Sequence, residues 1–231
     1  LTISTNLDVY EDLTKSDSDK YEYVPNFSFS KVINNNYSIN SNGYYKNYNT
    51  NITEKVLINN FEFESSPNFL NSGLVNERKF LVKNVNSSAS NSAKFKNKNS
   101  FSLIPSFQTN YSLPMIKETI KSRNTLTPKL SLRLSTPHTK DVRRIDRKID
   151  YNNIYDLDRL GIDDSNEGGI SLTYGYEQSI VDKSSLEEKL KFGFANNLRF
   201  EENKDLPLNS NLGDKVSDFV GALGYKPNKN F

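Results

Sequence analysis

Apolar and polar residues alternate along most of this chain, and this alternation limits the possible folds more than any other feature of the sequence. In the segment LTPKLSLRLS, residues 126–135, every second residue from Leu130 is leucine, and charged or hydroxyl-bearing residues lie between. Successive side chains of a strand point to opposite faces, so the segment is typical of a half-buried β-strand. The same period of two recurs in further segments: 1–9, 21–29, 101–113, 170–180, 186–200 and 219–225.

The number and length of these segments favour a membrane barrel. We expect about nine strands, several of them longer than about ten residues. A tilted strand needs about 9–11 residues to cross the hydrocarbon of a bilayer, whereas strands of soluble proteins are commonly nearer 5–6. The joins are of two kinds, short ones suited to hairpins and longer ones: 14–20 and 181–185, against 65–77, 86–98, 115–125 and 137–167. The predicted fold is all-β, an antiparallel up-and-down transmembrane β-barrel.

Composition excludes several classes of protein. Hydrophobic residues make up 35% and the mean hydropathy is −0.70, yet 13 Tyr and 14 Phe argue against a disordered chain. Tyrosines also fit the aromatic girdles at the two surfaces of a membrane barrel. The net charge of +2 gives no argument for a nucleic-acid partner, and the chain has no Cys for a disulfide or a thiolate metal site.

Two segments allow more than one interpretation. In residues 52–65 the apolar positions change phase, from Val56 and Ile58 to Phe61 and Phe63, which predicts a bulge near Asn59 or Asn60. Ser184 and Glu187 resemble a helix capping box. The apolar set that follows continues with period two as far as Phe200, so we predict a strand there.

No catalytic or cofactor site emerges from the residues. The one histidine, His138, stands in a polar loop beside Pro137. No phosphate-binding or dinucleotide-binding glycine pattern is present. We therefore expect no catalytic residue, no cofactor, no bound metal and no enzyme activity.

A calcium loop is the one metal site that the spacing suggests. Asp156, Asp158, Gly161 and Glu167 stand at its first, third, sixth and twelfth places. The fifth place holds Leu160, and strands rather than helices are expected on both sides. We take the calcium interpretation as the weaker one.

The stretch DYNNIYDLDRLG, residues 150–161, predicts a short helical turn inside a long loop. Asn152 or Asn153 would cap the turn at its start, and Gly161 would end it.

The same stretch contains residues suited to anchoring the loop. We expect Tyr155 and Leu157 to pack inward, and Arg159 to pair with a carboxylate such as Asp150 or Asp156. Asp150, Tyr155 and Arg159 are thus the candidate loop anchor.

The order of four segments resembles the outer-membrane lipopolysaccharide-assembly family, also called organic-solvent-tolerance proteins. The segments are SLPMIK at 112–117, LTPKLSLRLSTP at 126–137, DYNNIYDLDRLG at 150–161 and EGGISLTYGYEQ at 167–178. The resemblance is strongest between about residues 101 and 225, and looser before them.

This resemblance implies a role in lipopolysaccharide (LPS) transport in the outer membrane of a diderm bacterium. Residues 1–231 would be one partial barrel domain, a fragment of a larger barrel. The implied partners are LPS, a lipoprotein that plugs the lumen, the periplasmic bridge proteins of LPS transport and outer-membrane lipids. The family's periplasmic domain, lateral gate and cysteines have no counterpart in this sequence, so no residue is assigned to them.

The resemblance and the alternation together suggest which face is which. Leucine and phenylalanine positions would face lipid, and the cations between them would face the lumen, where they could contact LPS: Lys129, Arg133, Lys189 and Lys191. Two alternatives remain open, namely another outer-membrane barrel such as a porin or receptor, and a soluble surface β-sandwich or adhesin.

Overall fold

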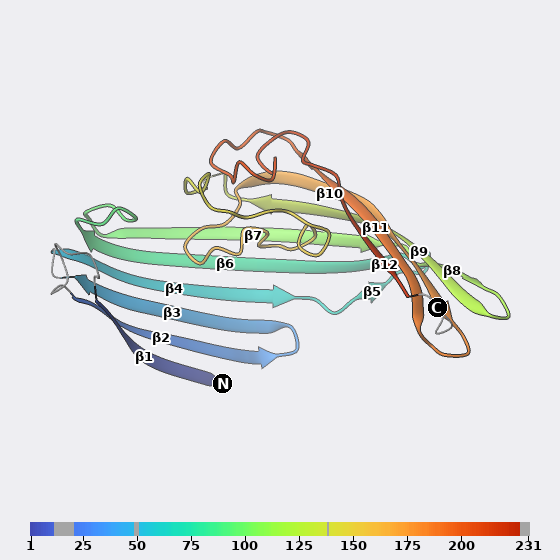
Figure 1. Ribbon diagram of the computed structural model, residues 1–231, viewed down its shortest axis with the longest axis horizontal. Helices are drawn as coiled ribbons and strands as arrows, with labels where there is room; N and C mark the ends of the chain where they lie inside the picture. Colours follow the sequence, from blue (N-terminus) through green and yellow to red (C-terminus); the bar gives the residue numbers. More distant parts are fainter. Residues whose placement is uncertain (12–20, 49–50, 138, 227–231) are drawn as a thin grey trace. The chain divides into compact units, whose positions relative to one another are not determined.

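The computed structural model describes residues 1–11, 21–48, 51–137 and 139–226. The hairpin expected at 14–20 and the loop histidine His138 lie outside the described residues. Within them every regular element is a strand (Figure 1). The strands are β1 (Thr2–Glu11), β2 (Tyr21–Asn34), β3 (Tyr37–Tyr48), β4 (Ile52–Glu64), β5 (Asn68–Phe69), β6 (Val75–Ser90), β7 (Ser100–Ser112), β8 (Met115–Glu118), β9 (Ser122–Ser135), β10 (Gly169–Asp182), β11 (Glu188–Arg199) and β12 (Val220–Tyr225).

The strands form one antiparallel sheet with up-and-down connections, which confirms the predicted fold class. Their order is β1-β2-β3-β4-β6-β7-β9-β10-β11-β12, with β5 paired to β6 and β8 paired to β9. Most strands of the main path have 10–16 residues, and β12 has 6. The strand predicted after the apparent capping box is confirmed as β11, and Asp182 holds the preceding turn by accepting hydrogen bonds from the N–H groups of Ser184 and Ser185.

The chain divides into two compact units. The first comprises Leu1–Phe63 and Leu81–Pro105, and the second comprises Glu64–Phe80 and Ser106–Phe231. Strands β6 and β7 contribute residues to both.

In the first unit, the phase change in β4 is not caused by a bulge towards β3. The β3–β4 ladder runs from Tyr37↔Phe63 to Tyr48↔Ile52 without a register shift, so the bulge predicted near Asn59 or Asn60 is wrong on that side. Instead, β4 carries apolar residues on both faces. Val56 and Ile58 pack with Val85 and with Phe95 from the β6–β7 loop.

In the second unit, one predicted long join is a hairpin. Residues 115–125 contain β8 and the start of β9, which pair from Met115↔Leu126 to Glu118↔Arg123. The turn between them is closed by hydrogen bonds between Thr119 and Ser122. The prediction missed it because β8 has only four residues, two adjacent apolar ones and then two charged ones, which show no alternation.

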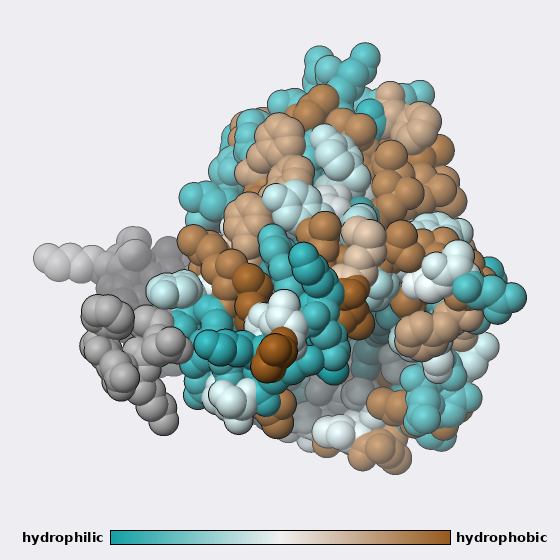
Figure 2. Space-filling model, turned by 90° about the vertical axis from the view of Figure 1, so that its right-hand side faces the viewer, coloured by the Kyte–Doolittle hydropathy of each residue, from teal (hydrophilic) through white to brown (hydrophobic). Residues whose placement is uncertain are grey.

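Many large apolar side chains remain on the surface. Leu130 is 42% exposed and Ile170 40%, and brown apolar residues are spread between teal polar ones in the space-filling view (Figure 2). Soluble sheets bury such residues and expose the polar face. In β9 and β10 the polar residues are the buried ones, which leads directly to the site described next.

Candidate functional site: a polar sheet face covered by a loop

One face of β9, β10 and β11 is polar and buried. The register places Arg133, Ser171 and Arg199 side by side in one row across the three strands, with Ser131, Thr173 and Asn197 in the adjacent row. All six are at most 6% exposed. Buried polar groups need hydrogen-bond partners, and the β9–β10 loop supplies at least one to each of the six except Ser131.

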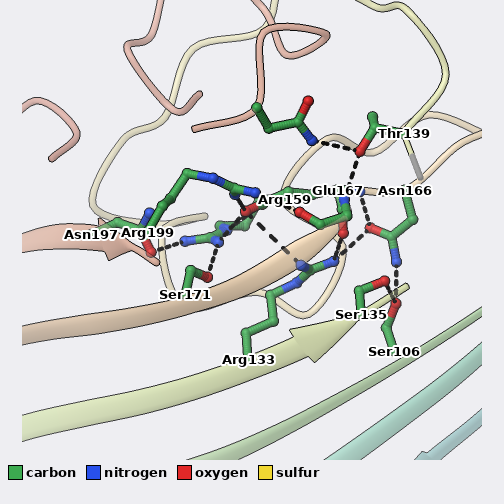
Figure 3. Close-up of polar contacts among 12 residues, drawn as sticks. Ser106, Arg133, Ser135, Thr139, Arg159, Asn166, Glu167, Ser171, Asn197 and Arg199 are labelled. Atoms are coloured by element: carbon green, nitrogen blue, oxygen red, sulfur yellow. Dashed lines mark hydrogen bonds and ion pairs between the residues drawn. The ribbon is translucent and has the colours of Figure 1, made fainter. Parts of the chain in front are cut away.

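The β9–β10 loop (residues 136–168, described except for His138) reaches this face through Arg159. The Arg159 guanidinium donates to both oxygens of Glu167, from Nε to Oε2 at 2.8 Å and from Nη2 to Oε1 at 2.6 Å. It also donates from Nη1 to Asn197 Oδ1 at 2.7 Å and from Nη2 to Ser171 Oγ at 2.7 Å. Arg159 thereby joins its own loop to β10 and β11 (Figure 3).

Two strand arginines converge on the same carboxylate and its neighbours. Arg199 donates to Glu167 Oε1 and to the carbonyl oxygen of Gly168. Arg133 donates to the carbonyl oxygen of Leu157 at 2.8 Å, to Asn166 Oδ1 at 3.0 Å and to the carbonyl oxygen of Glu167 at 2.6 Å. We call Arg133, Arg159, Glu167 and Arg199 the Arg–Glu cluster.

The Arg–Glu cluster places three guanidinium groups around one carboxylate that is 0% exposed. Burial alone would raise the pKa of the Glu167 carboxyl, but the charges of Arg159, Arg133 and Arg199 outweigh burial and lower this pKa from 4.5 to about 2. Removing one partner from such a group leaves an uncompensated buried charge, so each member depends on the others.

Asn166 and Thr139 extend the network. Asn166 Nδ2 donates to Ser106 Oγ at 2.9 Å, and Ser106 in turn shares a hydrogen bond with Ser135. The N–H of Gly168 donates to Thr139 Oγ1 at 2.7 Å. The end of the loop at Asn166 is therefore tied to β7 and β9, and Thr139 joins the start of the loop to this end.

The β9–β10 loop touches the sheet a second time, one to two residue rows beyond Thr173 in the direction of the β10–β11 turn. Tyr151 and Tyr155 of the loop lie against Gly193 and Gly175, where an added Cβ would come within 2.7 Å of the Tyr151 ring and 2.6 Å of Tyr155 Oη. The two rings meet edge to face with centroids 6.4 Å apart. Gly193 makes room for the Tyr151 ring, whereas at Gly175 an added Cβ would meet the carbonyl oxygen of Phe194 as well as Tyr155.

Glu177 gathers charged and hydroxyl groups beside the tyrosines. It accepts hydrogen bonds from Lys129 Nζ at 3.2 Å and Tyr151 Oη at 3.1 Å, and Lys191 Nζ lies 3.7 Å away. Burial, and then the negative charge of Glu177, raises the pKa of Tyr151 and of Tyr155. The Lys129 and Lys191 side chains remain 30% and 48% exposed.

The loop also has an apolar core of its own. Val142 and Leu160 pack against Leu206 and Leu212 of the β11–β12 loop, residues 200–219. All four are at most 3% exposed. The two loops begin at the same end of the strands in this unit, because β9 and β11 run in the same direction and both end there.

The structure places the sequence-derived site residues as follows. Arg159 pairs with Glu167 rather than with Asp150 or Asp156, and Arg133 is sealed beneath the loop. Lys129 and Lys191 meet at Glu177. Lys189 lies apart from them, in an ion pair of 2.7 Å with Glu187.

The helical turn expected at 150–161 is present only as one helix-like turn, in which the N–H of Ile154 donates to the carbonyl oxygen of Asp150 at 3.1 Å, and the predicted caps Asn152 and Asn153 are wrong. The residues make a hydrogen-bonded turn without a helix, and its cap is Asp150, whose Oδ1 accepts from the N–H groups of Asn152 and Asn153 at 2.8 and 3.0 Å. Gly161 has the positive φ of 59° expected of a terminating glycine. Tyr155 is half-buried, as is Leu157.

Sequence reasoning missed Glu167, Asn166 and Arg199 as partners in this site. Arg199 is an even number of residues from Lys189 and Lys191, so the alternation already placed it on the polar face of β11. Glu167, considered only as the last ligand of a calcium loop, is instead held by guanidinium groups. Among the described residues no group of three or more His, Cys, Asp or Glu could hold a metal ion.

No helix within the described ranges is both long and apolar enough to cross a membrane. No curated protein matches the chain. The family described as LPS transport system D, LptD, matches over residues 1–231. The chain therefore belongs to the LPS transport system D family, whose members serve LPS transport as outer-membrane proteins of Gram-negative bacteria.

Proposed function

We propose that these strands form part of the wall of an outer-membrane translocon that inserts LPS into the outer leaflet. The observation that carries the proposal is the inverted burial of β9 and β10, where polar residues are covered while leucines of β9 and Ile170 of β10 are exposed. A barrel in lipid requires this arrangement, with apolar residues outward and polar residues towards the lumen. The family assignment supports LPS as the transported molecule.

In this proposal the β9–β10 loop lies inside the lumen as a fixed lining. Outer-membrane barrels have short periplasmic turns and longer extracellular loops. In the second unit the two long loops therefore lie at the cell exterior, and the short turn between β10 and β11 lies at the periplasmic end. The loop would narrow the exit from the outside while leaving the periplasmic part of the polar face wet.

Lys129 and Lys191 are the best candidates for contact with LPS phosphate or acidic sugar. They lie on the polar face and keep part of their side chains exposed, whereas Arg133 is buried and donates from Nε and Nη2 to the loop. Lys189 lies at the turn between β10 and β11, so its contact with LPS would come at the periplasmic entrance. The lumen-plugging lipoprotein and the periplasmic bridge proteins are the proposed partners of the whole translocon.

The test is depletion of the full protein in its host, followed by complementation with the wild type or with Lys129→Gln/Lys191→Gln. We expect depletion to stop newly made LPS from reaching the cell surface, and the double variant to slow its arrival at equal barrel levels in the membrane. Unchanged surface LPS after depletion would contradict the translocon. If LPS reaches the surface at the normal rate in the double variant, the two lysines do not contact LPS during transport.

A further inference from the structure

Lys191, Glu177 and Lys129 lie on one diagonal across the polar face of β11, β10 and β9. Lys191 pairs with Ser179, two residues beyond Glu177 in β10. Lys129 pairs with Gly175, two residues before Glu177. Side chains two residues apart in a strand share a face, so the carboxylate stands between the two lysines.

Both ammonium groups lie against the same carboxylate oxygen. Lys129 Nζ is 3.2 Å and Lys191 Nζ is 3.7 Å from Glu177 Oε2. All three side chains keep part of their surface exposed, and two lysines with one carboxylate carry a single net positive charge. Exposed ion pairs of this kind contribute little to stability. The arrangement instead presents a weak positive charge to an anion on the polar face.

The diagonal follows the direction of transport in the proposed function, on which this inference rests. Lys191 is the nearer of the two lysines to the β10–β11 turn, which that function places at the periplasmic end. Lys129 is nearer to the β9–β10 loop, and its Nζ lies 5.9 and 5.7 Å from the ring centroids of Tyr151 and Tyr155. An anion that moves outwards therefore meets Lys191 first and Lys129 second.

Glu177 competes with such an anion for both lysines. Passage along a route needs binding that is strong enough for the ligand to enter and weak enough for it to leave, and a neighbouring like charge weakens binding. Tyr151 Oη donates to Glu177 Oε2 at 3.1 Å, which keeps the carboxylate in place when a lysine turns away. A phosphate group suits two lysines, because it carries up to about two negative charges and three acceptor oxygens.

We propose that Lys191, Glu177 and Lys129 form a phosphate relay, in which the two lysines bind a phosphate group of LPS in turn and Glu177 speeds its release. Glu177 takes back each lysine as the phosphate moves on. It acts through the lysines rather than by touching LPS, and is therefore a positioning residue.

The test measures how much LPS stays at the relay. A photo-crosslinking amino acid replaces Ser179, beside Lys191, in the full protein in its host, and the yield of LPS adduct is compared at equal barrel levels. We expect Glu177→Gln to raise the yield about fivefold, the upper range for removal of one exposed lysine–carboxylate pair, and to slow the arrival of LPS at the surface. The glutamine still accepts a hydrogen bond from Tyr151, so the contact with the loop is kept. Lys191→Gln should lower the yield.

Two variants separate the charge of Glu177 from its place in the structure. Glu177→Asp keeps the charge and should give a yield near that of the wild type. Glu118→Gln is the matched control, because Glu118 also holds two cations, Arg123 at 2.9 Å and Lys183 at 2.8 Å, beside the exposed β8–β9 hairpin. An unchanged or lower yield in Glu177→Gln, an equal rise in Glu118→Gln, or a wild-type yield in Lys191→Gln would overturn the relay.

Purified full protein in nanodiscs identifies the group that is held. Chemically dephosphorylated LPS should crosslink less than intact LPS and should show no gain in Glu177→Gln, and an equal gain would overturn phosphate as the ligand. Depletion tests the translocon separately. If depletion stops LPS delivery but Glu177→Gln changes nothing, the relay is rejected and the translocon proposal stands.

Discussion

Arg159 and Glu167, both of them buried, join through two parallel hydrogen bonds of 2.8 and 2.6 Å. Bidentate arginine–carboxylate pairs are among the strongest and most directional side-chain contacts in proteins. Here the pair closes a loop of the chain back onto itself while the same guanidinium bonds to β10 and β11. The position of the β9–β10 loop on the polar face therefore depends on this pair.

Replacing Arg159 with Met should release the loop, because Glu167 would lose two of its hydrogen bonds in a buried site. Breaking a buried pair costs about 3–5 kcal/mol. Chymotrypsin digestion of the full protein in membranes should then cut the β9–β10 loop faster, and the outer membrane should become more permeable to large antibiotics. Arg143→Met is the control, because Arg143 pairs with Asp141 on the surface and should change neither result. A silent Arg159 variant would refute the anchoring role.

Acid should loosen the loop only at low pH. The pKa of Glu167 is lowered in the folded protein, so the ionised carboxylate contributes stability that is complete above its unfolded pKa of 4.5 and is lost as the pH falls towards about 2. Protease protection of the loop should thus hold from pH 7 to about 5 and decline below. In Glu167→Gln, this decline should be absent. If the variant loses protection over the same pH range as the wild type, other carboxyl groups cause the decline.

Gly193→Ala should destabilise the protein because the new methyl group would overlap the Tyr151 ring. Overpacking of this kind typically costs about 1–3 kcal/mol. Thermal unfolding in detergent measures the loss, and Tyr151→Ala in the same chain should restore part of it. Gly224→Ala is the control, since its Cβ would stay 3.8 Å from the nearest side-chain atom. Equal effects at both glycines would show that Tyr151 does not rest on Gly193.

Leu130→Arg tests the outward face of β9. An arginine facing lipid near the bilayer centre costs about 2–4 kcal/mol. The amount of folded barrel in the outer membrane should fall, whereas Leu130→Met should leave it unchanged. Lys191→Leu, on the polar face, should have the milder effect. The reverse order would mean that the two faces have been exchanged.

The faces of the strands could be predicted from sequence because period two is a local property of an extended chain. Leu130 and Arg133 have opposite parity, and the structure separates them as this parity requires. The bulge prediction in β4 failed because it also used only the local pattern. Val56 and Ile58 are apolar because Phe95, far away in the sequence, packs on them, and no local pattern shows that contact.

The partners in the site could not be predicted in the same way. Arg159 has several acidic residues nearby in sequence, and its choice of Glu167 depends on the path of a loop without regular structure. Asp150 was a candidate partner but serves as the cap of the turn. Parity did place Arg199 on the polar face, and only the fold brings it to Glu167.

A double-mutant cycle on Arg159→Met and Glu167→Gln tests the central claim most directly, namely that this pair holds the loop on the polar face. The free energy of unfolding of the full protein is measured by urea titration, with protease protection of the β9–β10 loop as the signal. We expect a coupling of about 1–3 kcal/mol, as for residues in one buried network. Additive effects, with a coupling below about 0.5 kcal/mol, would contradict the claim.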